Sequence, residues 1–218
     1  MSTDTLSPPR TATAGPKIAS GAAVFFAVSL FASVASVNVP GDATDADLLA
    51  WWHDAGNQTS VIVSMFCGIA AAIFFAVVAN HLRALVSGSD HVARFAQSMA
   101  AAYTAALLVT AAVRGAVGYQ VKVAGEPVPD VGVLRYSTSL GYALLDNVAM
   151  TTLALSILAF SVAVIRTGAL GRWVAIVGIV CAVVIAGAVA ASVGAFAIPL
   201  ALLWAVCAAV AIWRRAAG

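Results

Sequence analysis

Charged side chains are scarce in this chain. Of its 218 residues only 9% are Asp, Glu, Lys or Arg, whereas 62% are hydrophobic; soluble proteins carry about 25% charged residues. So few charged side chains cannot cover the core of a soluble domain of this length. The formal net charge of +2 is spread over several segments and gives no basis for nucleic-acid binding. The composition therefore predicts an integral membrane protein.

Residues and motifs that carry chemistry are equally few. The three cysteines, Cys67, Cys181 and Cys207, lie within apolar runs without CxxC spacing, which is typical of small core hydrophobes. The chain has no Walker loop, no dinucleotide-binding glycine pattern, no G-x-S-x-G and no H-E-x-x-H. These absences argue against an enzyme and predict no cofactor and no metal site.

Histidine leaves one redox alternative. His81 and His91 flank a predicted inner loop and could supply two imidazoles to a haem, with Arg83 and Arg94 near its propionates. The sequence has only three histidines, and no second deep one supports electron transfer across a membrane. A haem- or quinone-binding redox subunit is therefore a less favoured function.

The chain contains several long apolar runs. A helix of about 20 apolar residues crosses a bilayer, and such runs predict an all-α bundle of six transmembrane helices within one domain, residues 18–215. The polar residues 1–17 predict a disordered cytoplasmic tail. The predicted spans are residues 18–38, 58–86, 92–119, 138–165, 172–192 and 195–213.

Basic residues predict the orientation. Loops rich in Lys and Arg stay in the cytoplasm, so both termini are predicted to be cytoplasmic. The preference for Arg, Ala and Val suggests a GC-rich genome and a bacterial plasma membrane. The basic residues of the predicted inner side are Arg10, Lys17, Arg83, Arg94, Arg166, Arg172, Arg214 and Arg215, against Lys122 and Arg135 outside.

Two outer loops are long enough to have structure of their own. Residues 42–55 predict a short amphipathic helix, with Trp51 and Trp52 on its apolar face and His53 beside them. Such a helix is typically an anchor in the membrane interface; the alternative is a lid over an outward-facing pocket. The second loop, residues 120–137, is predicted to be irregular because it contains glycine and two prolines.

Two charges, Arg114 and Asp146, lie inside predicted spans. A charge in hydrocarbon costs roughly 2.5–3.5 kcal/mol even on lenient scales, so it normally has a partner or a function. At about 1.5 Å per residue, both fall in the outer half of the bilayer, where consecutive antiparallel helices could bring them together. The same helical faces, or positions beside them, carry Tyr103, Thr110, Tyr142 and Asn147.

Three interpretations of this pair remain open, and the first is slightly favoured. Arg114 and Asp146 could form a structural clasp through a bidentate ion pair. They could also line a ligand or proton site, since ionisable residues in membranes usually mark such paths. Arg114 could instead extend to the headgroups and leave Asp146 protonated.

Two segments carry a resemblance. Residues 140–152 (LGYALLDNVAMTT) and 166–180 (RTGALGRWVAIVGIV) resemble a broad group of bacterial, actinobacterial-type six-helix membrane proteins of unknown function. These proteins have a Thr-Gly…Arg-Trp turn before the fifth helix, here Thr167, Gly168, Arg172 and Trp173. The resemblance implies a six-helix bundle in the plasma membrane and transfers no catalytic residues.

The sequence thus predicts a non-catalytic multi-pass membrane module. It would serve as an accessory subunit or as a bundle that binds lipid or a small molecule, with a partner membrane subunit or as a homo-oligomer. The alternative is a small-solute or proton-coupled carrier or channel using the cleft between Arg114 and Asp146. The two halves show no internal repeat and no pair of interrupted spans, and this favours the module.

Overall fold

The fold is entirely helical over the residues that the computed structural model describes, which are 14–37, 39–40, 43–87 and 90–217. A π-helical turn, η1 (Leu144–Ala149), joins α5 to α6, and a 3-10 turn, η2 (Gly194–Ala197), precedes α8. The α-helices are α1 (Ala14–Ala35), α2 (Asp45–His53), α3 (Ala55–Leu85), α4 (Asp90–Lys122), α5 (Val131–Ala143), α6 (Met150–Thr167), α7 (Arg172–Ala190) and α8 (Ile198–Ala217).

Six helical segments of this described part are long and apolar enough to cross a membrane. This agrees with the predicted multi-pass helical bundle. The short helix predicted in the first outer loop is also present, as α2. The six segments are Gly15–Ala35, Ala55–Leu85, His91–Lys122, Val131–Thr167, Arg172–Ala190 and Gly194–Ala217.

Two helix starts differ from the prediction. The fourth membrane segment begins at Val131 rather than at residue 138. Only residues 123–130 separate it from α4. The prediction of an irregular loop over residues 120–137 is therefore wrong at both ends. The first helix begins at Ala14 rather than at residue 18. It includes Pro16, which a first helical turn tolerates because its N–H groups have no intrahelical partner. Residues 1–13 of the predicted tail lie outside the described residues.

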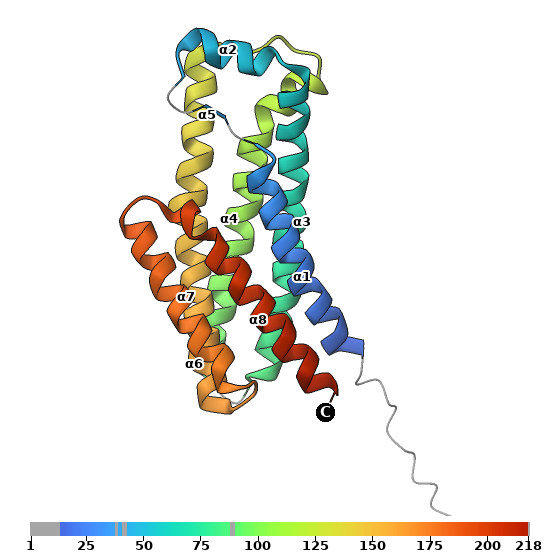
Figure 1. Cartoon of the computed structure of the whole chain (residues 1–218), viewed down its shortest axis with the longest axis vertical. Helices are drawn as coiled ribbons and strands as arrows, with labels where there is room; N and C mark the ends of the chain where they lie inside the picture. The colour runs from blue at the N-terminus through green and yellow to red at the C-terminus, as the bar shows by residue number, and fades with distance from the viewer. Residues whose placement is uncertain (1–13, 38, 41–42, 88–89, 218) are drawn as a thin grey trace, which may run out of the picture.

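The helices differ in length, and this divides the molecule into two parts. α3 and α4 have 31 and 33 residues, against 19 in α7, or roughly 46 and 50 Å against 28 Å at 1.5 Å per residue. Figure 1 shows that the α7–α8 turn lies far from the end that α2 covers. We call that end outer, and the part of α2, α3, α4 and α5 beyond the turn the cap.

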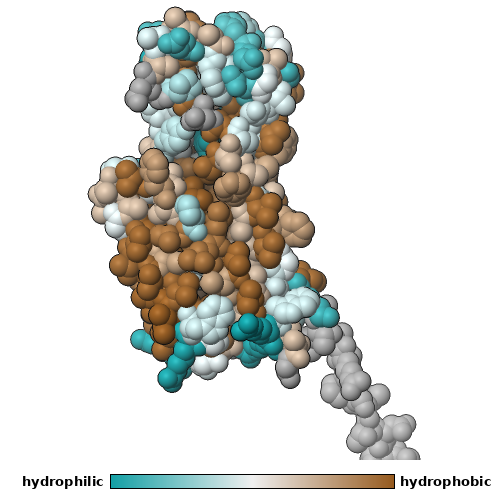
Figure 2. Space-filling model, in the orientation of Figure 1, coloured by the Kyte–Doolittle hydropathy of each residue, from teal (hydrophilic) through white to brown (hydrophobic). Residues whose placement is uncertain are grey.

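The surface and the interior both reflect this division. Figure 2 shows apolar residues over the part that contains α7 and α8, and more hydrophilic residues over the cap. A large core that includes Phe26, Phe75 and Ile157 fills the bundle. The cap has a small core of its own, formed by Val37, Leu48, Trp52, Val61, Val117 and Leu134.

Small residues set the register of the helices around the junction of the two cores. Gly115 of α4 lies against the side chain of Met65 of α3. Ser33 of α1 donates a hydrogen bond to the backbone carbonyl of Ser64 of α3 at 2.8 Å. Close backbone approach at such residues is how helices associate in lipid. These contacts place Arg114, the neighbour of Gly115, level with the serine pair.

Candidate functional site

Arg114 lies between α4 and α5 at the junction of the bundle and the cap. Its aliphatic stem rests on Gly141 of α5, where an added Cβ would lie 2.6 Å from Cγ of the arginine. Its guanidinium carbon lies 5.6 Å from the centre of the Tyr142 ring, an arrangement that contributes about 0.5–2 kcal/mol through the cation–π attraction. Helix packing therefore fixes the direction of the side chain.

The guanidinium has no hydrogen-bond or ion-pair partner among the described residues. Arg135 and Asp45 form an ion pair with each other in the cap, and neither of them reaches Arg114. A guanidinium carries five N–H donors and stays protonated. Arg114 thus presents a positive charge without an ion pair, and free donors, at the boundary between two apolar cores.

Asp146 has a different partner. It lies in the π-helical turn η1, and its Oδ1 accepts a hydrogen bond of 2.7 Å from the backbone N–H of Ala195. Gly194 lies directly against the backbone of Asp146. The carboxylate therefore caps η2 and joins the α7–α8 turn to the middle of the long α5–α6 helix.

The structure does not bring Arg114 and Asp146 into the direct ion pair that the clasp requires. Gly141, which contacts the arginine, precedes Asp146 by five residues, or about 7.5 Å of helix. Arg114 consequently lies farther out than Asp146. Depth in the bilayer, from which the pairing was predicted, does not show which groups each side chain faces.

Arg114 lines two small cavities, and a third cavity adjoins the first of them. The first has about 20 Å³ open to the centre of a water molecule, enough for about one water. The second, of about 10 Å³, shares Arg114 and Ser64 with it and reaches Ser33 and Thr110 in the bundle. The third, of about 180 Å³, lies between α2 and α5 and shares Val39, Thr138 and Tyr142 with the first. The first is lined by Val37, Val39, Trp52, Val61, Ser64, Arg114, Ser137, Thr138 and Tyr142.

Trp52 of α2 covers the cavity of Arg114. Its side chain is 2% exposed, and its buried Nε1 has no hydrogen-bond partner. Trp51 packs edge-on against it at 5.1 Å between ring centres, whereas His53 is exposed and lines none of the three cavities. The prediction that both tryptophans anchor α2 in the interface is thus wrong for Trp52, which is buried inside the protein because it closes the small core of the cap.

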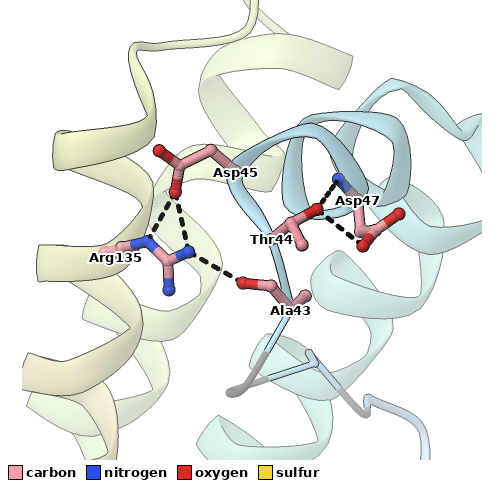
Figure 3. A network of polar contacts seen from close by, with 5 residues as sticks. All are labelled: Ala43, Thr44, Asp45, Asp47 and Arg135. Carbon is pink, nitrogen blue, oxygen red and sulfur yellow. Dashed lines mark hydrogen bonds and ion pairs between the residues drawn. The ribbon is translucent and has the colours of Figure 1, made fainter.

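An ion pair holds α2 in place over α5, as Figure 3 shows. Arg135 donates from Nε and Nη2 to one carboxylate oxygen of Asp45 at 3.1 and 2.7 Å. Its Nη2 also donates to the carbonyl of Ala43 at 2.8 Å. Thr44 caps the helix by accepting a hydrogen bond from the N–H of Asp47 at 3.2 Å. Sequence reasoning counted Arg135 only as a loop charge, because its partner lies 90 residues away.

Two of the other predicted residues belong to this site. Tyr142 lines the first and third cavities. Thr110 lines the second and is buried, with its hydroxyl donating to the carbonyl of Ala106 at 2.8 Å. The cavities reach both residues because they extend along α4 and α5 from Arg114.

Two further predicted residues lie elsewhere. Tyr103 packs in the core of the bundle against Phe26 and Phe75, with ring centres 6.3 and 4.6 Å away. Asn147 is exposed and donates to the carbonyl of Ala143 at 3.3 Å. The helical spacing that grouped them with the charged residues was correct along each helix. It could not show that the site ends about two turns farther out, at Thr110.

Sequence reasoning missed the hydroxyl groups that complete the site. Ser33 and Ser64 each donate to the other's backbone carbonyl, at 2.8 and 2.5 Å, and both line the second cavity. Ser137 and Thr138 of α5 were placed in or at the edge of an irregular loop. A prediction of helix at these two residues would have indicated that their side chains lie towards Arg114.

The two histidines considered for haem have different neighbours. The Nδ1 atom of His91 lies 3.1 Å from Nη2 of Arg94, whereas Arg215 is the charged neighbour of His81. Over the described residues, no group of three or more His, Cys, Asp or Glu side chains is arranged to hold a metal ion.

Comparison with known proteins gives no match. No model of a protein family matches the chain, and no curated protein or solved structure is significantly similar to it.

Proposed function

We propose that this protein is a non-catalytic six-span module of a bacterial plasma membrane, with both termini in the cytoplasm, that binds a small organic acid at its outer end. The observation that supports the proposal is the guanidinium of Arg114, which has no ion pair or hydrogen bond among the described residues and lines the cavity below Trp52. Its positive charge selects an anion.

The lining of the first cavity has the chemistry of an anion site. Arg114 offers charged N–H donors, and the indole Nε1 of Trp52 is a donor without a partner. Hydroxyl groups of Ser64, Ser137 and Tyr142 lie around them, and none of the described lining residues is acidic. A carboxylate has two oxygens that can accept hydrogen bonds from both donors. Such charge-assisted bonds are about twice as strong as neutral ones.

The sizes of the cavities limit the ligand. The first cavity, of about 20 Å³, has room for one water-sized group, such as one oxygen of a carboxylate. The adjoining cavity, of about 180 Å³, has Val39, Pro40 and Leu48 on its walls and suits a short apolar body. These two volumes favour a small monocarboxylate such as propionate.

The close packing of the bundle between the site and the inner end favours binding over transport. The cavities end near Thr110 and Leu145. Farther in, Tyr103, Phe26 and Phe75 are all at most 1% exposed and fill the centre of the bundle. A solute therefore has no path beyond Thr110 in this conformation. Flux of labelled propionate into liposomes that contain only this protein would overturn the proposed binding role in favour of a carrier.

The binding proposal can be tested by thermal unfolding of the purified protein in detergent. We expect sodium propionate to raise the melting temperature in a saturable way and the neutral isostere propionamide to leave it unchanged. A ligand at 100 times its Kd stabilises a protein by about 2.7 kcal/mol. The stabilisation should be absent in Arg114→Gln and retained in Arg166→Gln, which removes an arginine at the opposite end of the molecule. Equal stabilisation of the wild type and of Arg114→Gln would contradict the proposal.

A further inference from the structure

A second cavity of interest lies at the inner end, opposite the proposed ligand site. It has about 640 Å³ and lies between the α6–α7 connection, the last turns of α8 and the end of α3. Its apolar walls include Leu85, Leu170 and Trp173, and its charged groups are Arg214 and Arg215. We call it the inner groove.

The two arginines of the inner groove have different roles. Nη1 of Arg215 donates to the backbone carbonyl of Ala169 and thereby holds the end of α8 against the α6–α7 connection. Arg214 is exposed and makes no hydrogen bond or ion pair among the described residues. One cation of the groove is therefore structural and the other is free to bind an anion.

The surroundings of the groove add to its positive potential. α7 begins at its edge, and no side chain caps the N-terminus of this helix; such an end carries a partial positive charge. None of the described residues that line the groove is acidic. Arg172 is the first residue of α7 and stands between Gly171 and Trp173, which both line the groove.

The position of the groove relates this charge to a membrane surface. Trp173 and Trp213 are 41% and 53% exposed, and exposed tryptophans at the ends of spans are typical of the headgroup level. Figure 2 shows hydrophilic residues directly below the apolar surface at this end. The groove is thus amphipathic and lies where headgroups would meet the protein.

We propose that the inner groove binds the phosphate headgroup of an anionic phospholipid of the inner leaflet. Arg214 contacts the phosphate, and Trp173 and Leu85 contact the glycerol and the first methylene groups. Basic pockets between membrane helices on the cytoplasmic side are suited to such lipids. The apolar walls favour a lipid over free phosphate, because phosphate alone would leave them in contact with water.

Brominated lipids that quench tryptophan fluorescence test this site. The experiment uses a variant with Trp213→Phe as its background. The signal of Trp173 is the difference in fluorescence between this variant and a second one that also has Trp173→Phe. We expect brominated phosphatidylglycerol to bind next to Trp173 at least three-fold more tightly than brominated phosphatidylcholine. The preference should disappear in Arg214→Gln and persist in Arg166→Gln, a basic residue of the same end that does not line the groove.

The outcomes distinguish the lipid from other ligands. Equal binding of the two lipids by the wild type would overturn the proposal, and so would a preference that survives Arg214→Gln. Competition by millimolar inorganic phosphate in phosphatidylcholine nanodiscs would assign the groove to free phosphate instead. Size-exclusion chromatography and the melting temperature show whether Arg214→Gln is folded; if it is not, Arg214→Lys, which keeps the charge, should retain the preference.

Discussion

Gly141 lies directly against Arg114, so that a Cβ at position 141 would be 2.6 Å from Cγ of the arginine. This contact is where α5 meets α4 at the boundary between the two cores. The direction of the guanidinium is thus set by the absence of a side chain on the neighbouring helix, together with the ring of Tyr142. Asp146 faces the α7–α8 turn instead.

Gly141→Ala should therefore displace Arg114. Forcing an extra methyl group into packed surroundings costs about 1–3 kcal/mol, and we expect both a lower melting temperature and a loss of propionate-dependent stabilisation. Gly132→Ala is the matched control, because this glycine of the same helix has nothing within 4 Å of an added Cβ. The predicted contact would be contradicted if the two variants behaved alike in thermal unfolding with and without propionate.

Asp146→Ala should destabilise the protein through its cap on η2. Loss of an N-terminal cap costs about 0.5–2 kcal/mol, whereas Asp146→Asn keeps an oxygen that can accept the N–H of Ala195. We expect the asparagine variant to unfold close to the wild-type temperature and the alanine variant to unfold below it. If both variants lost the same stability, the charge of Asp146 rather than its hydrogen bond would be what matters.

A double-mutant cycle of Arg114→Gln and Asp146→Asn should show weak coupling. Breaking a buried ion pair costs about 3–5 kcal/mol because it leaves one charge without a partner. Since the two side chains have separate surroundings, we expect single losses well below this range and a coupling energy under about 1 kcal/mol. Chemical unfolding of the four proteins measures it, and a larger coupling would restore the clasp.

The ion pair between Arg135 and Asp45 should control access to Trp52 more than stability. Their side chains are 42% and 70% exposed, and such pairs contribute about 0–1 kcal/mol. In Arg135→Gln we expect nearly unchanged unfolding but stronger quenching of Trp52 by acrylamide, because α2 is held less firmly over the cavity. Lys122→Gln removes another basic residue of the cap and serves as the control; Trp52→Phe identifies the signal. Unchanged quenching in Arg135→Gln would show that the pair does not hold α2 closed.

The membrane segments could be predicted because their signal is local. A run of about 20 apolar residues has few alternatives to a membrane-spanning helix, and α2 followed from the spacing of its apolar side chains. The start of α5 at Val131 differs from the prediction, because the prolines before it favour a longer irregular loop. The π-helical turn at Leu144–Ala149 was missed as well. Its Asp146 contacts the α7–α8 turn, which is 49 residues away.

The sequence by itself identified Arg114 and Asp146 as the unusual residues and grouped Thr110 and Tyr142 with them, because a charge in an apolar run and polar side chains at helical spacing are visible without a fold. Only the tertiary structure decided which groups share a cavity. It separated Asp146 and Tyr103 from Arg114, and it joined Arg135 to Asp45. The physical reason is that periodicity determines the face of a helix, whereas the neighbour of that face depends on how far one helix extends past another.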